Sequence, residues 1–356
     1  MKKVCLLLLC CSALLLGCSE KLHTSEIELT VMNEFILSEE TQEHLHRVHT
    51  IAMDNPTDSE IAFSNATSPI GIVVTDYDGK FVEKIGKEGR GPDEVMRTRN
   101  FGFDGDGNLV ILDKPSSFFK SYDRLTGDVH SFEYPIQQGI HVTSRNLEYC
   151  NDKWYLAIQL LGRAPYPSVP IVGVFNEQFS VVDTLGGYDP FFDGRSSISQ
   201  EPVINVDCSN NRIYTGHSKT PYIQVYSMDN HELIGRTKEI PPMFMLSEKF
   251  ITMVTNPTEM IRFQTEEQSL SLMIETNDKY IFHVYRNDNY TKMGNRYLNE
   301  RDHYVAVYNK ENLSYIGSVK VPGAILGSAK DGYLIMIEDE TTMQIQFLDI
   351  KPKEIN

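Results

Sequence analysis

A glycine-rich, charged loop is the part of the chain whose residues are best suited to chemistry. Residues 86–94 read Gly-Lys-Glu-Gly-Arg-Gly-Pro-Asp-Glu. Such glycines could let the backbone cradle a phosphate. However, the loop lacks the Gly-Lys-Ser/Thr end of a P-loop and the third glycine of a dinucleotide-binding fingerprint. The alternative is a tight structural connection. If the loop binds a ligand, we expect its charged side chains to make the contacts: Arg90, Glu94, Arg97 and Arg99.

Asp104, Asp106 and Asn108 place oxygen atoms at alternate positions, as a calcium loop does. An EF-hand loop would also need glycine at its sixth position and glutamate at its twelfth, where this chain has Leu109 and Pro115. We therefore predict a structural turn at this place.

Three closely spaced histidines could also bind a metal. On a strand, His44 and His46 would share one face, whereas His49 would point the other way. No cysteine or carboxylate stands at a set metal spacing from them, so we favour a solvated strand edge. The sequence implies no cofactor and no resident metal.

The segment 241–302 is long and rich in methionine in its first part. Its methionines are Met243, Met245, Met253 and Met260. Short helices are expected at 247–251 and 259–263, and they could pack on the core or offer an apolar surface to a partner. The chain has no Gly-x-Ser-x-Gly and no His-Glu-x-x-His pattern of a hydrolase.

A short polar turn between two apolar strands recurs six times and predicts the architecture. The copies lie at residues 56–59, 104–108, 151–153, 210–212, 277–279 and 330–332. Their mean spacing of roughly 50 residues is typical of propeller blades. We therefore predict an all-β, six-bladed β-propeller, a ring of small sheets around a central channel. The loop with Arg90 then connects the first and second blades, where it could face the mouth of the channel.

The last blade is incomplete. It has strands at 333–337 and 343–347, and the chain then ends near Asn356. The alternating segment 26–31 is otherwise unassigned. Because an open ring would leave unpaired strand edges, we predict that this N-terminal segment completes the last blade and closes the ring.

The N-terminus is predicted to be a targeting segment. Two lysines precede the apolar residues 4–16, which are too few for a comfortable membrane span. The following Leu15-Leu16-Gly17-Cys18 resembles the bacterial lipobox, which implies lipid modification of Cys18. The alternative is an ordinary secretory signal. The predicted parts are a signal peptide at 1–17, a lipid-anchored tether at 18–25 and the propeller domain at 26–356. A lipid-anchored protein with these parts is expected in the cell envelope, on the periplasmic side or at the cell surface, with the outer membrane favoured.

The chain is acidic. Its formal net charge of −16 becomes −18 when Lys2 and Lys3 leave with the signal. This charge argues against binding of nucleic acid or of an anionic membrane through the protein surface.

Two cysteines remain in the body of the protein, Cys150 and Cys208. Both stand next to a first turn, in adjacent blades. We expect equivalent points of neighbouring blades to lie farther apart than the roughly 7 Å between Cα atoms that a disulfide allows. The prediction is two free, buried thiols.

Residues 81–95 resemble the hallmark of the six-bladed β-propeller lipoproteins of Bacteroidetes, a strand ending in isoleucine-glycine followed by a Gly-x-Gly-Pro-x-Glu loop. The matching residues are Gly89, Gly91, Pro92 and Glu94. Residues 104–113 are similar to the strand starts of NHL-type and TolB-like propellers. The resemblance implies this fold and an envelope location, and it carries over no catalytic residue. Asp183-Thr184-Leu185 resembles the O-glycosylation sequon of Bacteroidetes, which would place a glycan on Thr184.

The function that we expect is recognition. A monomeric, rigid propeller, held at the membrane by lipid on Cys18, would bind a protein, peptide or glycan at one end of its channel. The contact regions would be the loop 90–99 and the segment 241–302. The alternative is a propeller enzyme of the lactonase, lyase or glycan hydrolase type, which could use a divalent cation in the channel. A structural surface protein is a third interpretation, and the fold alone cannot choose among them.

Overall fold

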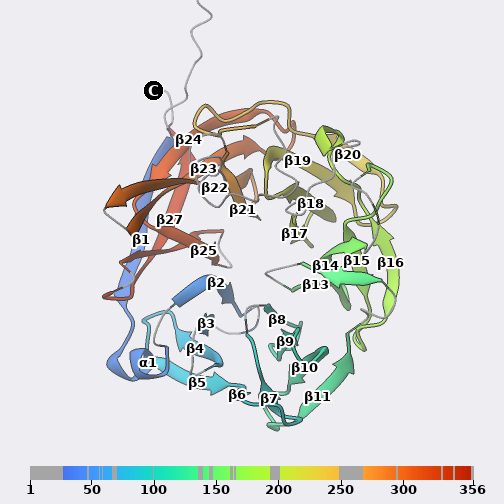
Figure 1. Cartoon of the computed structure of the whole chain (residues 1–356), viewed down its shortest axis with the longest axis vertical. Coiled ribbons are helices and arrows are strands. Elements are labelled where there is room, and N and C mark those ends of the chain that lie inside the picture. Colours follow the sequence, from blue (N-terminus) through green and yellow to red (C-terminus); the bar gives the residue numbers. More distant parts are fainter. Residues whose placement is uncertain are drawn as a thin grey trace, which may run out of the picture.

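Six antiparallel sheets stand around a common axis and form a closed ring (Figure 1). This computed structural model describes residues 27–45, 48–55, 57, 59–65, 70–98, 100–134, 139–143, 147–160, 163, 166–192, 201–247, 268–293, 296–329, 332–339 and 341–353. Each sheet is one blade, and its first strand lies nearest the axis. The predicted all-β, six-bladed propeller is confirmed. The predicted signal peptide and tether lie outside the described residues and stay predictions.

The first three blades occupy the N-terminal half of the chain. Blade 1 consists of β2 (Val48–Asp54), β3 (Glu60–Asn65), β4 (Ile72–Asp76) and β5 (Phe81–Ile85). Blade 2 consists of β8 (Phe101–Phe103), β9 (Leu109–Asp113), β10 (Phe118–Tyr122) and β11 (Val129–Glu133). Blade 3 has a divided inner strand and consists of β12 (Ile140–Val142), β13 (Glu148–Cys150), β14 (Lys153–Leu160), β15 (Val172–Phe175) and β16 (Val181–Leu185).

The other three blades complete the ring. Blade 4 consists of β17 (Pro202–Asp207), β18 (Arg212–His217), β19 (Thr220–Ser227) and β20 (Leu233–Arg236). Blade 5 consists of β21 (Leu270–Thr276), β22 (Tyr280–Met293), β23 (Arg296–Asn309) and β24 (Tyr315–Val321). Blade 6 consists of β25 (Ala324–Ser328), β26 (Leu334–Asp339), β27 (Gln344–Pro352) and β1 (Ile27–Ile36).

The predicted N-terminal strand closes the ring. β1 pairs antiparallel with β27, from Ile27 opposite Pro352 to Ile36 opposite Gln344. Ile27 and Leu29 pack against the apolar cluster that blades 5 and 6 share. The strand is longer than the predicted segment 26–31, but its role is the predicted one.

The polar turns that the structure describes in full, at 104–108, 151–153, 210–212 and 277–279, lie where the repeat predicts them, between the first and second strands of their blades. Asn151 and Asp152 show the geometry most clearly, with φ values of 50° and 57°. Two consecutive left-handed residues form the hairpin turn that Asn and Asp tolerate best. Asp104 accepts hydrogen bonds from the backbone nitrogens of Asp106 (3.0 Å) and Asn108 (2.8 Å). These hydrogen bonds are those of the predicted structural turn.

The alternation of strand direction gives the ring two distinct ends. Turns from first to second strand, and from third to fourth strand, lie at one end, which we call the turn end. Turns from second to third strand, and all connections between blades, lie at the opposite loop end. The loop 90–99 and the long β22–β23 hairpin extension therefore share the loop end. The cavity lined by Asp207 and Lys310 and the polar network around these two residues, both described below, lie at the turn end.

The apolar cores lie between neighbouring blades. Val110 and Leu112 of β9 pack with Trp154 and Phe175 of blade 3 in one buried cluster. The ring of Phe119 stacks on that of Phe179, with 4.2 Å between the centroids. Blade-to-blade burial of this kind gives the functional loops a rigid base.

A short helix, α1 (Glu39–His44), connects β1 to β2 and corrects the histidine prediction. Ser38 caps the helix by accepting a hydrogen bond from the backbone nitrogen of Thr41 at 3.2 Å. His44 therefore ends a helix and does not lie on a strand edge, His46 lies outside the described residues, and His49 belongs to β2. The missed signal was the Ser38 cap followed by two glutamates.

The extra length of segment 241–302 is explained in part by a long hairpin. β22 and β23 are each 14 residues long, and they pair along their whole length. The two short helices expected within this segment lie at least in part outside the described residues. No helix in the described ranges is long and apolar enough to cross a membrane.

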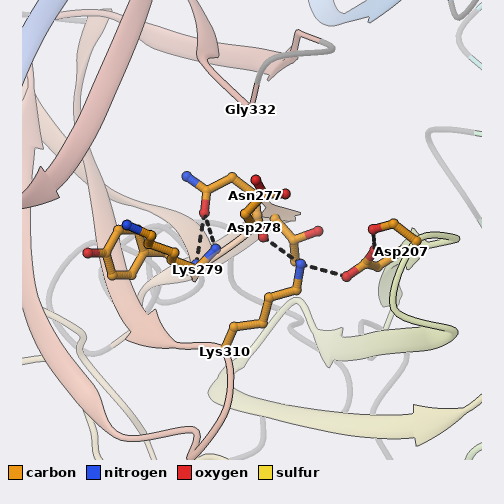
Figure 2. A pocket seen from close by; sticks show the side chains of 9 residues that line it. Asp207, Asn277, Asp278, Lys279, Lys310 and Gly332 are labelled. Atoms are coloured by element: carbon orange, nitrogen blue, oxygen red, sulfur yellow. Dashed lines mark hydrogen bonds and ion pairs between the residues drawn. The ribbon is translucent and has the colours of Figure 1, made fainter.

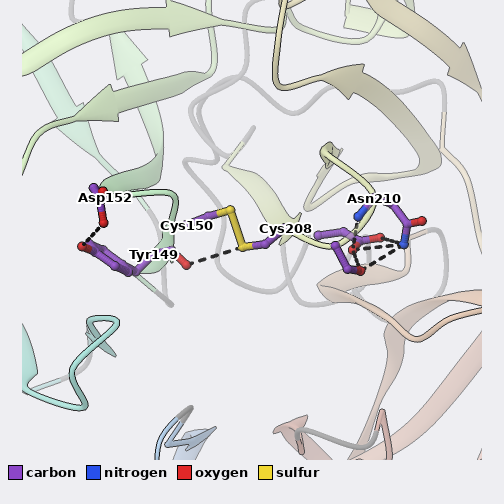
Figure 3. The surroundings of a disulfide bond; sticks show 7 residues. Tyr149, Cys150, Asp152, Cys208 and Asn210 are labelled. Atoms are coloured by element: carbon purple, nitrogen blue, oxygen red, sulfur yellow. Dashed lines mark hydrogen bonds between the residues drawn. A yellow bond between two sulfur atoms is a disulfide. The ribbon is translucent and has the colours of Figure 1, made fainter.

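Cys150 and Cys208 form a disulfide, so the prediction of two free thiols is wrong (Figure 3). Their Cα atoms are 5.8 Å apart, within the range of disulfides. Cys150 ends the inner strand β13, and Cys208 directly follows the inner strand β17. Neighbouring blades converge at the axis, which makes these two positions closer than the prediction assumed. Cys150 is buried, but Cys208 is exposed, which also corrects its predicted burial.

Candidate functional site

The loop after blade 1 holds its shape through its own residues. β6 (Lys87–Glu88) pairs in parallel with β7 (Glu94–Val95). The Glu94 carboxylate accepts a hydrogen bond from the backbone nitrogen of Gly91 at 2.7 Å. A side chain at Gly89 would collide with this carboxylate. Glu94, one of the predicted ligand-binding residues, thus shapes the loop.

This loop is docked on blade 2 beside a cavity. Lys120 of β10 donates from its Nζ to the carbonyl oxygens of Gly91, at 3.0 Å, and of Glu94. A cavity of about 620 Å³ lies next to this contact, and its lining includes Arg90, Met96 and Phe118. Of the predicted residues, Arg90 therefore faces a space that a ligand could enter.

Arg97 is positioned by a buried carboxylate. The Asp113 side chain, 1% exposed, accepts hydrogen bonds from the backbone nitrogens of Met96 (3.2 Å) and Arg97 (3.1 Å). This leaves the exposed Arg97 guanidinium beside Lys114, whose pKa it affects. Arg99 lies outside the described residues.

Basic side chains from three further positions gather with Arg97 at the loop end. We call Arg97, Lys114, His141, Glu201 and Lys219 the loop-end cluster. Lys114 belongs to blade 2, His141 to blade 3 and Lys219 to blade 4, and all three are half-buried. The backbone nitrogen of Ser218 donates to the carbonyl oxygen of Glu201 at 2.9 Å, which fixes Glu201 next to Lys219.

The pKa values of the loop-end cluster show that its charges affect one another. Burial lowers the pKa of Lys114, and Arg97 adds to this effect, whereas Glu201 opposes it. Burial and then Lys114 lower the pKa of His141. Burial also lowers the pKa of Lys219, whereas the carboxylates of Asp288 and Glu201 raise it. Glu201 thus acts on three basic groups, with Asp288 as a second carboxylate near Lys219, and such an arrangement could accept a further anion.

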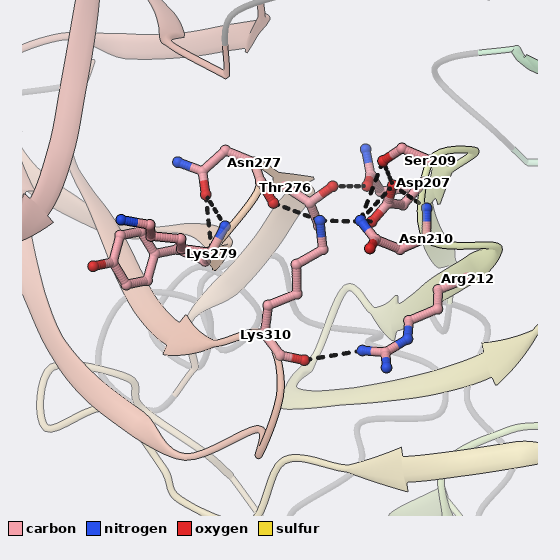
Figure 4. A network of polar contacts seen from close by, with 10 residues as sticks. Asp207, Ser209, Asn210, Arg212, Thr276, Asn277, Lys279 and Lys310 are labelled. Carbon is pink, nitrogen blue, oxygen red and sulfur yellow. Dashed lines mark hydrogen bonds and ion pairs between the residues drawn. The ribbon is translucent and has the colours of Figure 1, made fainter.

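A buried ion pair stands at the turn end (Figure 4). Lys310 Nζ lies 2.6 Å from Asp207 Oδ2, and the two residues are 4% and 7% exposed. Burial opposes ionisation of Asp207, but hydrogen bonds from Lys310, Ser209 and Asn210 outweigh it, and the pKa of the carboxyl lies below its usual value. The carbonyl oxygen of Lys310 accepts from Arg212 at 3.1 Å. The pair therefore joins blades 4 and 5.

A cavity of about 510 Å³ opens beside this ion pair (Figure 2). Its lining comes from the turns of blades 4, 5 and 6 and includes Asp207, Asn277, Asp278, Lys279, Lys310 and Gly332. Nearly all of these residues carry polar side chains. No sequence motif marks the cavity because its walls come from separate blades.

Glu275 is a buried carboxyl between the inner strands of three blades. It lies on β21, accepts from Ser328 of β25 at 2.7 Å, and accepts from Asn205 of β17 at 3.3 Å. Burial raises its pKa to about 7, although the hydrogen bond from Ser328 acts in the opposite direction. The protonated form is therefore favoured in the folded state at mildly acidic pH.

Glu275→Gln should remove a pH dependence of folding. The pKa of Glu275 is higher in the folded state than its ordinary 4.5. Its contribution to the free energy of unfolding is therefore full below pH 4.5 and is lost as the pH rises through 7. We expect the variant to match the parent near pH 4.5 and to exceed its free energy of unfolding by up to about 3 kcal/mol at pH 8. Urea unfolding between these pH values tests this, with Glu311→Gln as an exposed control. Equal pH profiles for parent and Glu275→Gln would contradict it.

Thr184, the predicted glycosylation position, lies on β16, the outer strand of blade 3. It is half-buried, and its backbone nitrogen donates to the neighbouring Asp183 carboxylate at 2.7 Å. Asp183 also lies 3.3 Å from His231 Nδ1. Within the described part of the chain, no group of three or more His, Cys, Asp or Glu side chains could hold a metal ion.

Comparison with protein families gives one match. The model of the family DUF5128, described as a 6-bladed beta-propeller, matches residues 19–322. No curated protein sequence matches the chain significantly.

Two of the similar solved structures come from Bacteroides. A member of the DUF4221 family from Bacteroides vulgatus ATCC 8482 is 14% identical, with a TM-score of 0.68, and the alignment covers 93% of this chain and 100% of that one. A protein of Bacteroides fragilis NCTC 9343 that is described as exported is 12% identical, with a TM-score of 0.60 and coverage of 93% and 97%. At these identities the likeness shows the fold.

Proposed function

Since the chain belongs to the DUF5128 family of six-bladed β-propellers, we propose that it is a rigid recognition platform that binds an anionic group of a protein, peptide or glycan at the loop end of the ring. The observation that supports this best is the loop-end cluster, in which Glu201 acts on both Lys114 of blade 2 and Lys219 of blade 4, and Arg97 lies beside Lys114. The whole chain has a net charge of −16, so a local group of cations is unlike the rest of its surface.

The cell-envelope location is part of the same proposal. Lipid on Cys18 would hold the body at a membrane, and β1 begins nine positions later at Ile27. The lipobox-like sequence before Cys18 supports this anchor. Mass spectrometry of peptides from the native protein tests acylation of Cys18 and, on the peptide around Asp183, a glycan on Thr184.

Binding of an anionic polysaccharide tests the proposed site. We expect polygalacturonate or dextran sulfate to bind the soluble body, and neutral dextran to bind much more weakly. Because two cations are removed from one site, Lys114→Ala combined with Lys219→Ala should weaken binding by about 10- to 30-fold, or roughly 1.4–2 kcal/mol. Isothermal titration calorimetry at two salt concentrations would measure this.

The control is Lys153→Ala, which removes one exposed lysine at the opposite end of the ring. Equal losses in the control and the double variant, or no preference for the anionic polymers, would contradict the proposed site. Shortening of the polymer during the titration would instead support the enzyme alternative.

A further inference from the structure

The cavity at the turn end has the size and the construction of a ligand site. Its volume of about 510 Å³ lies within the range of small-molecule pockets. Three blades contribute to it, through Asp207 and Ser209 of blade 4, the turn 276–280 of blade 5, and Gly332 of blade 6. Figure 2 shows Lys310 of the cavity lining between Asp207 and Asn277.

The floor of the cavity is fixed. An ammonium group has three hydrogen-bond donors. Within the described residues, Lys310 directs two of them to the Asp207 carboxylate and the carbonyl oxygen of Asn277. Asp207 is held in turn by Ser209 at 2.7 Å and by Asn210 at 3.0 Å. The ammonium therefore keeps its position, and one donor is left for a ligand.

The wall of the cavity is fixed as well. The side-chain oxygen of Asn277 accepts from the backbone nitrogens of Lys279 (3.0 Å) and Tyr280 (2.8 Å), which sets the orientation of its amide. Gly332 has a φ of 78° and approaches Asn277 so closely that any side chain there would collide with it. A larger residue at position 332 would also need a strained backbone.

The charges around the cavity balance one another. Lys310 pairs with Asp207 on the floor, and the exposed Asp278 and Lys279 stand side by side at the rim. There is thus no excess charge to select an anion or a cation, and the polar lining does not suit an apolar ligand. Hydroxyl groups, which both donate and accept hydrogen bonds, suit such a surface. We propose that this cavity binds a neutral pyranose sugar, at a second site opposite the loop-end cluster.

The chain supplies its own matched control. The tripeptide Asn-Asp-Lys of the cavity, residues 277–279, occurs again at residues 151–153, in the equivalent turn of blade 3. The second copy does not line this cavity, and its Asp152 accepts a hydrogen bond from the Tyr149 hydroxyl at 3.4 Å. The same two substitutions can therefore be made with and without the cavity beside them.

Saturation-transfer NMR with single sugars tests the proposal. The probes are glucose, galactose, mannose and N-acetylglucosamine at about 10 mM each, which detects millimolar dissociation constants. We expect at least one sugar to bind. Asp278→Asn with Lys279→Ala should weaken that binding at least about tenfold. Asp152→Asn with Lys153→Ala, and the loop-end variant Lys219→Ala, should leave it unchanged.

The outcomes are separable from those of the proposed loop-end site. Absence of saturation transfer from all four sugars would overturn the inference, as would equal losses in the two matched double variants. Tighter binding of glucuronate than of glucose, weakened by Asp278→Asn with Lys279→Ala but not by Lys219→Ala, would overturn the neutral class of ligand for this cavity. Thermal melts of each variant show whether a loss of binding reflects unfolding.

Discussion

Deletion of residues 24–37 is expected to abolish the cooperative unfolding transition of the whole domain. The deletion removes β1, which pairs with β27 from Ile27 to Ile36 and is the outer strand of blade 6. It also removes Leu37, whose buried side chain belongs to the core shared by blades 6 and 1. The edge of β27 would be exposed, and an unpaired edge favours aggregation. Calorimetry or circular dichroism on heating would show a broad change without a single transition.

A circular permutant keeps this prediction testable if the deletion variant does not fold. Ile27 lies opposite Pro352 in the β1–β27 pair, so a short turn can join the two strands covalently. New termini can be opened between Asp229 and Asn230, in the exposed turn that leads to β20. We expect the permutant to melt cooperatively at or above the melting temperature of the parent.

The control for the deletion of 24–37 is a deletion of 19–26, which spares β1. A deletion of 24–37 that melts like the parent would contradict this role of β1.

The fold was predictable because its signals are local. Asn, Asp and Gly at the turns tolerate left-handed backbone, and they separate strands at intervals that are irregular but average roughly 50 residues. The same repeat showed that the last blade lacks a strand. Because the edge of that blade needs a partner, the N-terminal segment could be assigned to it. The helix at Glu39–His44 was missed because its signal, the Ser38 cap, is short, and because the three nearby histidines were interpreted as part of a strand.

The sites were predictable only where they lie within one loop. Arg90 and Arg97 belong to a single inter-blade connection, and the structure places one beside a cavity and the other in the loop-end cluster. Lys310 and Asp207, by contrast, come from different blades and meet at 2.6 Å. The closure of the ring brings such residues together, and a single sequence carries no local signal of it. Glu275 was missed for the same reason, because Ser328 and Asn205 reach it from two other blades.

The disulfide gives the second large effect. Replacing both cysteines, by Cys150→Ala and Cys208→Ala, should lower the free energy of unfolding by about 4 kcal/mol, since the bond closes a loop with a sequence separation of 58 residues. For a domain of this size that is roughly 6 °C in melting temperature. Urea unfolding of the purified body, prepared without reductant, measures the difference.

The control uses the exposure of Cys208, which gives a reductant access to the bond. Reduction should destabilise the parent by nearly as much as the double substitution does, and it should leave the double variant unchanged. Each single substitution should cost about as much as the double, because either one breaks the bond. If mass spectrometry of the unreduced protein found two free thiols, the bond and this effect would both be refuted.

The disulfide joins the inner strands of blades 3 and 4, close to the axis. Its loss should therefore loosen the ring at that interface first, and hydrogen exchange should rise in β13 and β17 before it rises in blade 1.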